Sequence, residues 1–547
     1  MQSSMPSKKE PMTDTPLPRD RDLLSRRNLI QAGLGAAAGT MLPPSGALAE
    51  DGEGPMTFEG VVAQARALAA APYQPPPDDL PPALAKLDYD AYRGIVFRPE
   101  ASPTLNRLFS VQLFHRGFLQ RKRVALFIQS DAGPPRRIAY ESRLFRLGDK
   151  LAGKTFSPEL GFAGFRLHYA FDPEQAAHQE EFLVFLGASY FRLRGKGQEY
   201  GLSARAAAID TANPGRPEEF PDFTAFWICE PEPEARTVTI LALLDSPSLA
   251  GAYRFEIAPG DPSRIKVTAS LQPRKAIGRL GIVPLTSMFL HGQNGPGARN
   301  AVLLDDYRPQ VHDSDGLVVA TPGDRVWRPL VNGRAGPQAS LFQADALSGF
   351  GLLQRERRFA AYLDVQARQE ARPGLWVEPK GGFGPGSVEL FEIPSREEYA
   401  DNVVAAFVPR EPVAEGTRLS LDYTLTTVGP EPDPTLPGTL ARVVSTRVGS
   451  PDQLRPVTPP IPGRRLFAID FEGPGLPDSA EAEMTAIVSA SAGKMVEPVI
   501  ERVTPTGGWR LYVEWRPPTP LPPGDIVLRA RLLVQGRPVS ETWDAVV

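Results

Sequence analysis

The sequence predicts an all-β protein in which a large β-sandwich is followed by a small one. Stretches of alternating apolar and polar residues dominate the chain after about residue 82, which is the pattern of half-buried strands. Turn signals such as Asp-Pro, Pro-Gly and Gly-Pro separate these stretches. The alternation of strands and helices that builds a parallel sheet is absent, and so is an internal repeat of about 20–50 residues.

The composition of the 547-residue chain agrees with this fold class. Its 59 prolines and 49 glycines are dispersed, and a proline inside a helix costs about 3 kcal/mol. A formal net charge of −4 excludes a strongly basic nucleic-acid-binding protein. One cysteine, Cys229, excludes an internal disulfide and a thiolate metal site, and the five histidines lack metal-ligand spacing. We therefore expect no metal and no other cofactor.

The first 49 residues are predicted to be an export signal of the twin-arginine (Tat) type. A polar region carries Arg26 and Arg27, a weakly apolar run follows from Leu29 to Leu42, and Ala47-Leu48-Ala49 provides a cleavage site. This run is shorter than the roughly 18 residues needed to cross a bilayer, which disfavours a membrane anchor. We expect delivery to the periplasm and a mature chain without a transmembrane segment.

The mature chain is expected to open with a helix over 57–71, capped by Thr57, and a Pro-rich connector over 73–82. Period-two patterns then predict strands at 110–114, 123–129, 165–170, 237–244, 253–257, 264–271, 387–393, 418–425, 465–472, 509–515 and 526–534.

The Pro-rich stretch 448–463 is the best candidate for a domain boundary. It interrupts the strand pattern and separates a large domain, residues 50–447, from residues 464–547. The second part has the length of one small immunoglobulin-like sandwich.

Two acidic clusters are the best candidates for chemistry. One contains His312, Asp313 and Asp315, and the other contains Glu398 and Asp401. A glycosidase needs two carboxyl groups in opposite protonation states. Crowding of Asp401 by Glu398 would raise the pKa of one of them by repulsion between like charges. From the spacing alone, a solvated acidic turn or a helix cap is the better explanation of each cluster.

Sugar-binding clefts combine aromatic platforms with polar side chains. Stretches with these residue types occur at 187–211, 218–227, 305–317, 326–333 and 372–386. Aromatic residues at strand ends more often pack in a core.

Many segments resemble the bacterial periplasmic glucan biosynthesis proteins G and D, known as OpgG and OpgD. They occur in order across nearly the whole mature chain and include FLGASYFR (185–192), YGLSARAAAIDT (200–211), YRPQVHDSDGL (307–317), DNVVAAF (401–407) and the terminal SETW (540–543). The Tat-like signal favours the D type.

The resemblance implies a galactose-mutarotase-like β-sandwich followed by an immunoglobulin-like domain. It also implies action on the β-1,2-linked backbone of osmoregulated periplasmic glucans, as an inverting endo-β-1,2-glucanase. Asp401 matches the family's general acid and Asp313 its general base. The chain departs from the family pattern at Ala206, Val331, Gly333 and Phe383, and Phe383 is expected near a segment that closes over the cleft.

The side chains expected to contact substrate are Tyr190, Arg192, Arg205, Tyr307, His312, Asp315, Trp327, Trp376 and Glu398.

Three alternatives stay open. The protein could transfer or cyclise the glucan instead of hydrolysing it, or bind the glucan without catalysis. The C-terminal domain could dock a membrane glucan synthase, although immunoglobulin-like domains serve many functions. A homodimer is also considered.

Overall fold

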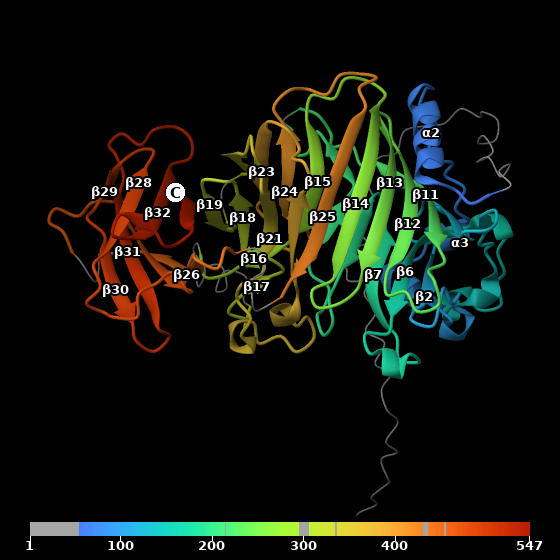
Figure 1. The fold of residues 1–547 in the computed structure, drawn as a ribbon, viewed down its shortest axis with the longest axis horizontal. Helices are drawn as coiled ribbons and strands as arrows, with labels where there is room; N and C mark the ends of the chain where they lie inside the picture. Colours follow the sequence, from blue (N-terminus) through green and yellow to red (C-terminus); the bar gives the residue numbers. More distant parts are fainter. Residues whose placement is uncertain (1–53, 214, 295–305, 334–335, 430–435, 453–455) are drawn as a thin grey trace, which may run out of the picture.

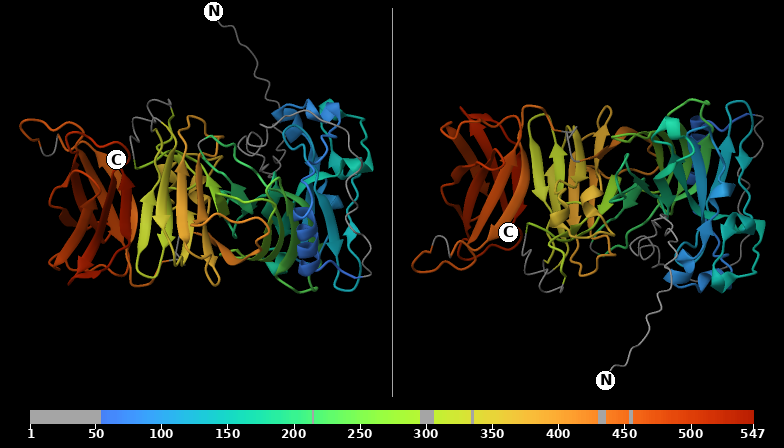
Figure 2. Two further views of the ribbon diagram at one scale, coloured as in Figure 1. Left: turned by 90° about the horizontal axis from the view of Figure 1, so that it is seen from above. Right: turned by 90° about the horizontal axis from the view of Figure 1, so that it is seen from below.

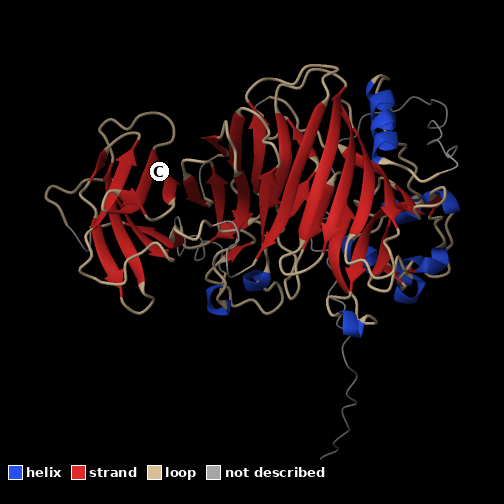
Figure 3. Ribbon diagram, in the orientation of Figure 1, coloured by secondary structure: helices blue, strands red, loops and turns tan. Residues whose placement is uncertain are grey.

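The computed structural model describes residues 54–547 except 214, 295–305, 334–335, 430–435 and 453–455 (Figure 1). The predicted export signal at 1–49 lies outside the described residues. Strands dominate the described chain, which confirms the predicted all-β class (Figure 3). None of the described helices has the length and apolar character that a bilayer crossing requires.

The predicted N-terminal helix is confirmed as α2 (Phe58–Ala69). The Thr57 side chain accepts a hydrogen bond from the Gly60 N–H, 3.1 Å away, and so caps the helix. Its buried face, Val61, Val62 and Ala65, packs against residues of the second sheet described below. Two shorter helices follow, α3 (Pro82–Ala85) and α4 (Tyr89–Arg93).

Within the described residues, one face of the large sandwich is a ten-stranded sheet. Its strands in spatial order are β2 (Phe109–His115), β6 (Phe162–Tyr169), β7 (Glu180–Leu186), β8 (Tyr190–Leu193), β9 (Ser203–Arg205), β15 (Leu280–Ser287), β24 (Val403–Pro409), β23 (Gly386–Glu392) and β20 (Gln338–Gln343), and β10 (Ala207–Ile209) also pairs with β15.

A second sheet has fifteen described strands and continues into the C-terminal part of the chain. Its order is β28 (Met484–Ala490), β32 (Val527–Val534), β34 (Thr542–Val546), β19 (Arg325–Pro329), β18 (Gly316–Ala320), β21 (Gly349–Leu353), β22 (Gly374–Pro379), β25 (Leu419–Val428), β14 (Arg264–Pro273), β13 (Leu249–Ala258), β12 (Val238–Asp245), β11 (Asp222–Cys229), β3 (Ala125–Gln129) and β4 (Arg136–Arg137), with β33 (Arg537–Pro538) beside β32.

The remaining described strands form smaller sheets. They are β26 (Arg442–Gly449), β27 (Arg465–Glu472), β31 (Gly508–Arg516), β29 (Lys494–Met495) and β30 (Val499–Val503) in one sheet, and the pairs β1 (Val96–Phe97) with β5 (Phe145–Arg146) and β16 (Phe289–His291) with β17 (Val311–His312).

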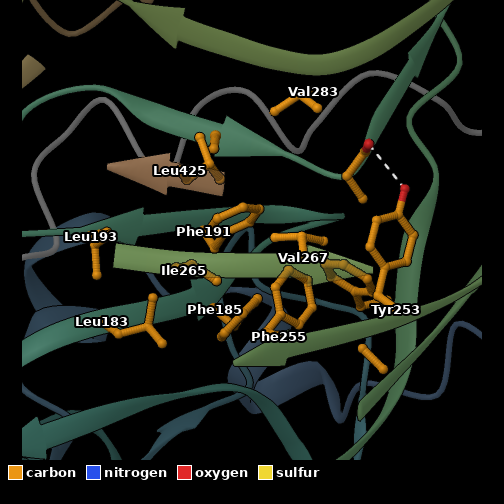
Figure 4. Packing of buried hydrophobic residues seen from close by; sticks show 14 of the residues in the cluster. Leu183, Phe185, Phe191, Leu193, Tyr253, Phe255, Ile265, Val267, Val283 and Leu425 are labelled. Atoms are coloured by element: carbon orange, nitrogen blue, oxygen red, sulfur yellow. Dashed lines mark hydrogen bonds between the residues drawn. The ribbon is translucent and has the colours of Figure 1, made fainter. Parts of the chain in front are cut away.

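The main core lies between the ten-stranded and fifteen-stranded sheets and is rich in aromatic rings (Figure 4). Phe185 is at its centre, with ring centroids 5.3 Å from both Phe191 and Phe255. The buried Tyr253 hydroxyl donates a hydrogen bond to the Ala206 carbonyl at 3.0 Å. Val283 has a left-handed φ of 49° where the pairing of β15 shifts register, and such bulges redirect a strand.

The C-terminal part is joined to the large sandwich by strand pairing. The residues of β34 lie parallel to β19, with Trp543 opposite Trp327, so one sheet runs through both parts (Figure 2). The strand β26 pairs with β27 across the Pro-rich stretch, so the C-terminal sheet begins before residue 448. The predicted boundary at 448–463 begins in the last two residues of β26 and otherwise lies, in the chain, between the paired strands β26 and β27.

Replacing Phe185 by alanine is expected to lower the free energy of unfolding by about 3–5 kcal/mol, because it leaves a cavity among packed rings. Urea unfolding of the large sandwich measures this change. Leu341→Ala is the control, since Leu341 is exposed on the edge strand β20 and its truncation should cost less than about 0.5 kcal/mol. Equal losses in both variants would contradict the packing described here.

Candidate active site

The two acidic clusters are brought together by one segment, residues 287–289, at the end of β15. The Asp313 N–H donates to the Met288 carbonyl at 2.8 Å, and the Asn402 N–H donates to the Ser287 carbonyl at 3.1 Å. The Asn402 side chain also accepts from the Phe289 N–H and donates to the Phe289 carbonyl. Consecutive residues of one segment thus hold the backbone beside Asp313 and Asp401.

Asp313 is a buried carboxylate with a dedicated counter-charge. Only 2% of its surface is exposed, and its side chain forms an ion pair with Arg372. The Arg372 Nε donates to the Ala367 carbonyl at 3.0 Å, which fixes the guanidinium. A guanidinium in contact with a carboxylate favours the charged form of the carboxylate. Arg372 is the first residue of the stretch 372–386, which combines aromatic and polar residues. Nothing in the sequence spacing predicted its ion pair with Asp313.

Asp401 lies partly exposed directly before β24 and close to Tyr190. Burial raises the pKa of Tyr190 to about 12, and the negative charge of Asp401 adds to this shift while Arg205 opposes it. The structure therefore brings together Asp401 and two of the predicted substrate contacts, Tyr190 and Arg205.

Arg205 is held between two aromatic rings. Its Cζ lies 5.0 Å from the ring centroid of Tyr190 and 4.7 Å from that of Phe220, and its Nη1 donates to Glu218 at 2.8 Å. Arg205 is 1% exposed, and its Nε and Nη2 make no hydrogen bond within the described residues. Arg192, on the neighbouring strand, donates to the Ser203 hydroxyl at 2.8 Å. Glu218 and Phe220 lie in the stretch 218–227, whose composition is typical of sugar-binding clefts, but neither residue was predicted individually.

Arg308 links Glu398 of the second acidic cluster to two further carboxylates and was not predicted. Its guanidinium contacts Asp306, Asp364 and Glu398, with a distance of 2.8 Å to the Glu398 carboxylate. The expected repulsion between Glu398 and Asp401 is therefore offset by a positive charge. Tyr307, next in the chain, is 75% exposed and presents its ring to solvent.

The charge of Arg308 alters the titration of its partners. Burial alone would raise the pKa of Asp306, but hydrogen bonds and the charge of Arg308 hold that pKa below its usual value. Burial likewise opposes ionisation of Asp364, yet its pKa is lowered by the N–H groups of Ala367 and Gln366 and by Arg308.

His312 and Asp315 belong to a buried polar network. The His312 ring nitrogens contact Gln354 at 2.8 Å and Gln310 at 2.9 Å, and burial lowers the pKa of His312 so that the ring is neutral. The Asp315 carboxylate accepts from the backbone N–H groups of Arg355 and Glu356. These contacts favour a role in positioning the Asp313 segment over direct contact with substrate.

Trp327 and Trp376 pack in the core shared with the C-terminal part. Both are buried, the guanidinium of Arg355 lies 3.7 Å from the Trp327 ring centroid, and that of Arg325 lies 5.3 Å from Trp376. This placement favours a packing role over a sugar platform for both rings.

Phe383 packs beside the end of β24 that lies away from Asp401. Its ring centroid is 5.4 Å from that of Phe407, which is six positions after Asp401 in the chain. The expected nearness of Phe383 to a segment that closes over the cleft stays a prediction.

No group of three or more His, Cys, Asp or Glu side chains arranged to hold a metal ion occurs in the part of the chain that the structure describes.

Arg308→Met is expected to lower the free energy of unfolding by about 3 kcal/mol at pH 7, since three carboxylates lose a partly buried partner. The lowered pKa values of Asp306 and Asp364 stabilise the fold fully above the unfolded value of about 4, and this contribution is lost as the pH falls through the folded values. The difference in the free energy of unfolding between wild type and Arg308→Met should therefore become smaller as the pH is lowered.

Urea unfolding at a series of pH values measures this difference. Arg410→Met is the matched control, because Arg410 pairs with the exposed Asp345 and such surface pairs contribute little. A difference for Arg308→Met that does not change with pH would contradict the assignment.

Comparison with known proteins identifies the family. The family model described as periplasmic glucan biosynthesis protein, MdoG, matches residues 56–546. The glucans biosynthesis protein G of Shewanella frigidimarina (strain NCIMB 400) is 42% identical over 492 residues, which cover 88% of this chain and 83% of the relative. The protein of the same name from Rhodopseudomonas palustris (strain BisA53) is 41% identical over 526 residues, covering 95% and 99%. This chain therefore belongs to the MdoG family of periplasmic glucan biosynthesis proteins.

Proposed function

We propose that this protein is an inverting endo-β-1,2-glucanase that acts on the backbone of periplasmic glucan, with Asp401 as general acid and Asp313 as general base. The observation that carries the proposal is that two carboxylates with unlike surroundings are held by one segment, residues 287–289. Inversion requires one carboxyl group that donates a proton and one that accepts a proton.

Asp313 suits the role of base because the ion pair with Arg372 favours its charged form. Since its carboxylate is almost fully buried, we infer that the proton reaches it through a water molecule or a substrate hydroxyl. In an inverting reaction the attacking water stands on the face of the sugar opposite the leaving group.

Asp401 suits the role of acid because it is partly exposed and lies beside Tyr190, where a glycosidic oxygen could reach it. The proton that Asp401 gives to the leaving oxygen is balanced by the proton that Asp313 receives from water. After the reaction Asp401 is ionised and Asp313 is protonated, and the starting state returns when Asp313 releases a proton to solvent and Asp401 takes one up.

The residues around Asp401 suit a polysaccharide. Tyr190 and Phe220 offer rings on which pyranose faces can stack, and Phe220 is 37% exposed. The buried guanidinium of Arg205 lies against both rings, and we infer that it orients them. Glu398 contacts Arg308, and the exposed Tyr307 directly precedes Arg308 in the chain. The family name supports glucan as the polymer, and the resemblance supports the β-1,2 linkage.

Export by the Tat route and assignment to the D type are part of this proposal and rest on the first 49 residues. The relatives reported above carry the name G. Replacing Arg26 and Arg27 by lysines and following the cellular location of the protein tests the route.

Asp401→Asn is expected to lower kcat on linear β-1,2-glucan by about 100-fold to 10,000-fold, because the leaving oxygen loses its proton donor. Asp313→Asn should cause a loss of the same order. The rate is measured from the appearance of new reducing ends. NMR of the anomeric configuration at the newly formed reducing end tests for inversion.

Glu397→Gln is the control for this experiment. It removes an exposed carboxylate from the same segment as Asp401 and should leave kcat unchanged. Full activity of Asp401→Asn would overturn the assignment. Cyclic or lengthened products from the wild type would instead indicate transfer, and binding without any product would indicate a non-catalytic glucan-binding factor.

A further inference from the structure

The C-terminal strand β34 carries two carboxylates into the large sandwich. Glu541 directly precedes β34 and Asp544 lies within it, and both are almost fully buried. Two of their arginine partners, Arg355 and Arg328, come from the large sandwich, and Asp544 also pairs with Arg529 of the C-terminal part. A buried ion pair fixes geometry strongly, because loss of one partner leaves an uncompensated charge.

The first connection leads to the Asp313 segment. The Glu541 carboxylate pairs with the guanidinium of Arg355 and accepts the Val443 N–H at 2.7 Å. The Arg355 backbone N–H donates to both oxygens of Asp315, at 3.0 and 2.9 Å. Asp315 is two residues from Asp313, and its own N–H is held by the Leu353 carbonyl at 2.9 Å.

The second connection leads to the Asp401 segment. Asp544 lies 3.1 Å from the Arg328 guanidinium, which in turn lies 3.4 Å from Glu392 at the end of β23. The next residue, Ile393, donates its N–H to the Asn402 carbonyl at 2.8 Å. Asn402 directly follows Asp401 and is anchored to residues 287 and 289.

We propose that Glu541 and Asp544 are positioning residues for the two candidate catalytic carboxylates. Glu541 holds the Asp313 segment through Arg355 and Asp315, and Asp544 holds the Asp401 segment through Arg328 and Glu392. Neither residue touches the reacting atoms. The proposal rests on the proposed function for its kinetic consequence, but not for the mechanical connection.

A displacement of about 1 Å in a catalytic group can cost about 100-fold in rate. We therefore expect Glu541→Gln and Asp544→Asn each to lower kcat by about tenfold to 100-fold, while KM for linear β-1,2-glucan changes less than about threefold. A purely structural role would lower the melting temperature but leave kcat of the folded protein unchanged.

The matched control is Glu514→Gln. Glu514 is an equally buried carboxylate that pairs with Arg464 and Arg516 inside the C-terminal part. Its replacement should destabilise the protein while kcat stays at the wild-type value. All assays are made on the full mature chain, below the unfolding temperature of every variant.

Hydrogen–deuterium exchange separates this proposal from the proposed function. Glu541→Gln should speed exchange in the peptide 311–317 and Asp544→Asn in the peptide 393–403, and Glu514→Gln should change neither. Unchanged exchange at these peptides would overturn the proposal even if the enzyme is active. If the wild type forms no product, the proposed function fails, and the exchange rates still decide whether β34 holds the two segments.

Asp315→Asn keeps the test decisive if Glu541→Gln does not fold, because it weakens the same connection from within the large sandwich. It should also speed exchange in the peptide 311–317 and lower kcat. Wild-type exchange and kcat in this variant would overturn the first connection.

Discussion

The site depends on the backbone of residues 287–289, which holds both acidic segments. The Ser287 and Met288 carbonyls accept hydrogen bonds from the N–H groups of Asn402 and Asp313, respectively. The Phe289 N–H donates to the Asn402 side chain. Asp313 and Asn402 are nearly ninety positions apart in the chain, and their hydrogen bonds to this segment hold them close together in space. The bulge at Val283 directs the end of β15 toward this point.

Charge is distributed around this backbone so that each carboxylate has its own environment. Arg372 compensates Asp313, and Arg308 compensates Asp306, Asp364 and Glu398. The repulsion that the sequence suggested between Glu398 and Asp401 is thereby offset. The two proposed catalytic carboxylates differ in burial, since Asp313 is almost fully buried and Asp401 is partly exposed.

The sequence predicts those features that depend on local pattern. The all-β class follows from period-two alternation, α2 follows from the Thr57 cap, and the acidic segments follow from motifs that resemble a known family. The contacts of Arg308 with Glu398 and of Arg372 with Asp313 could not be assigned, because each joins residues that are far apart in the chain. Trp327 and Trp376 illustrate a second limit, since a ring in a strand has the same pattern whether it faces a sugar or a core.

The boundary of the C-terminal part shows a third limit. A Pro-rich stretch indicates an interruption of strands, but it cannot tell a linker from a loop between two paired strands such as β26 and β27. In the structure the C-terminal part shares a sheet and a core with the large sandwich, and the terminal SETW segment is buried in that junction. A surface used in this way is not free for another protein. If the C-terminal part docks a glucan synthase, it must do so through faces that lie away from β34. The SETW segment, which resembles the family at this end of the chain, is part of the junction with the large sandwich.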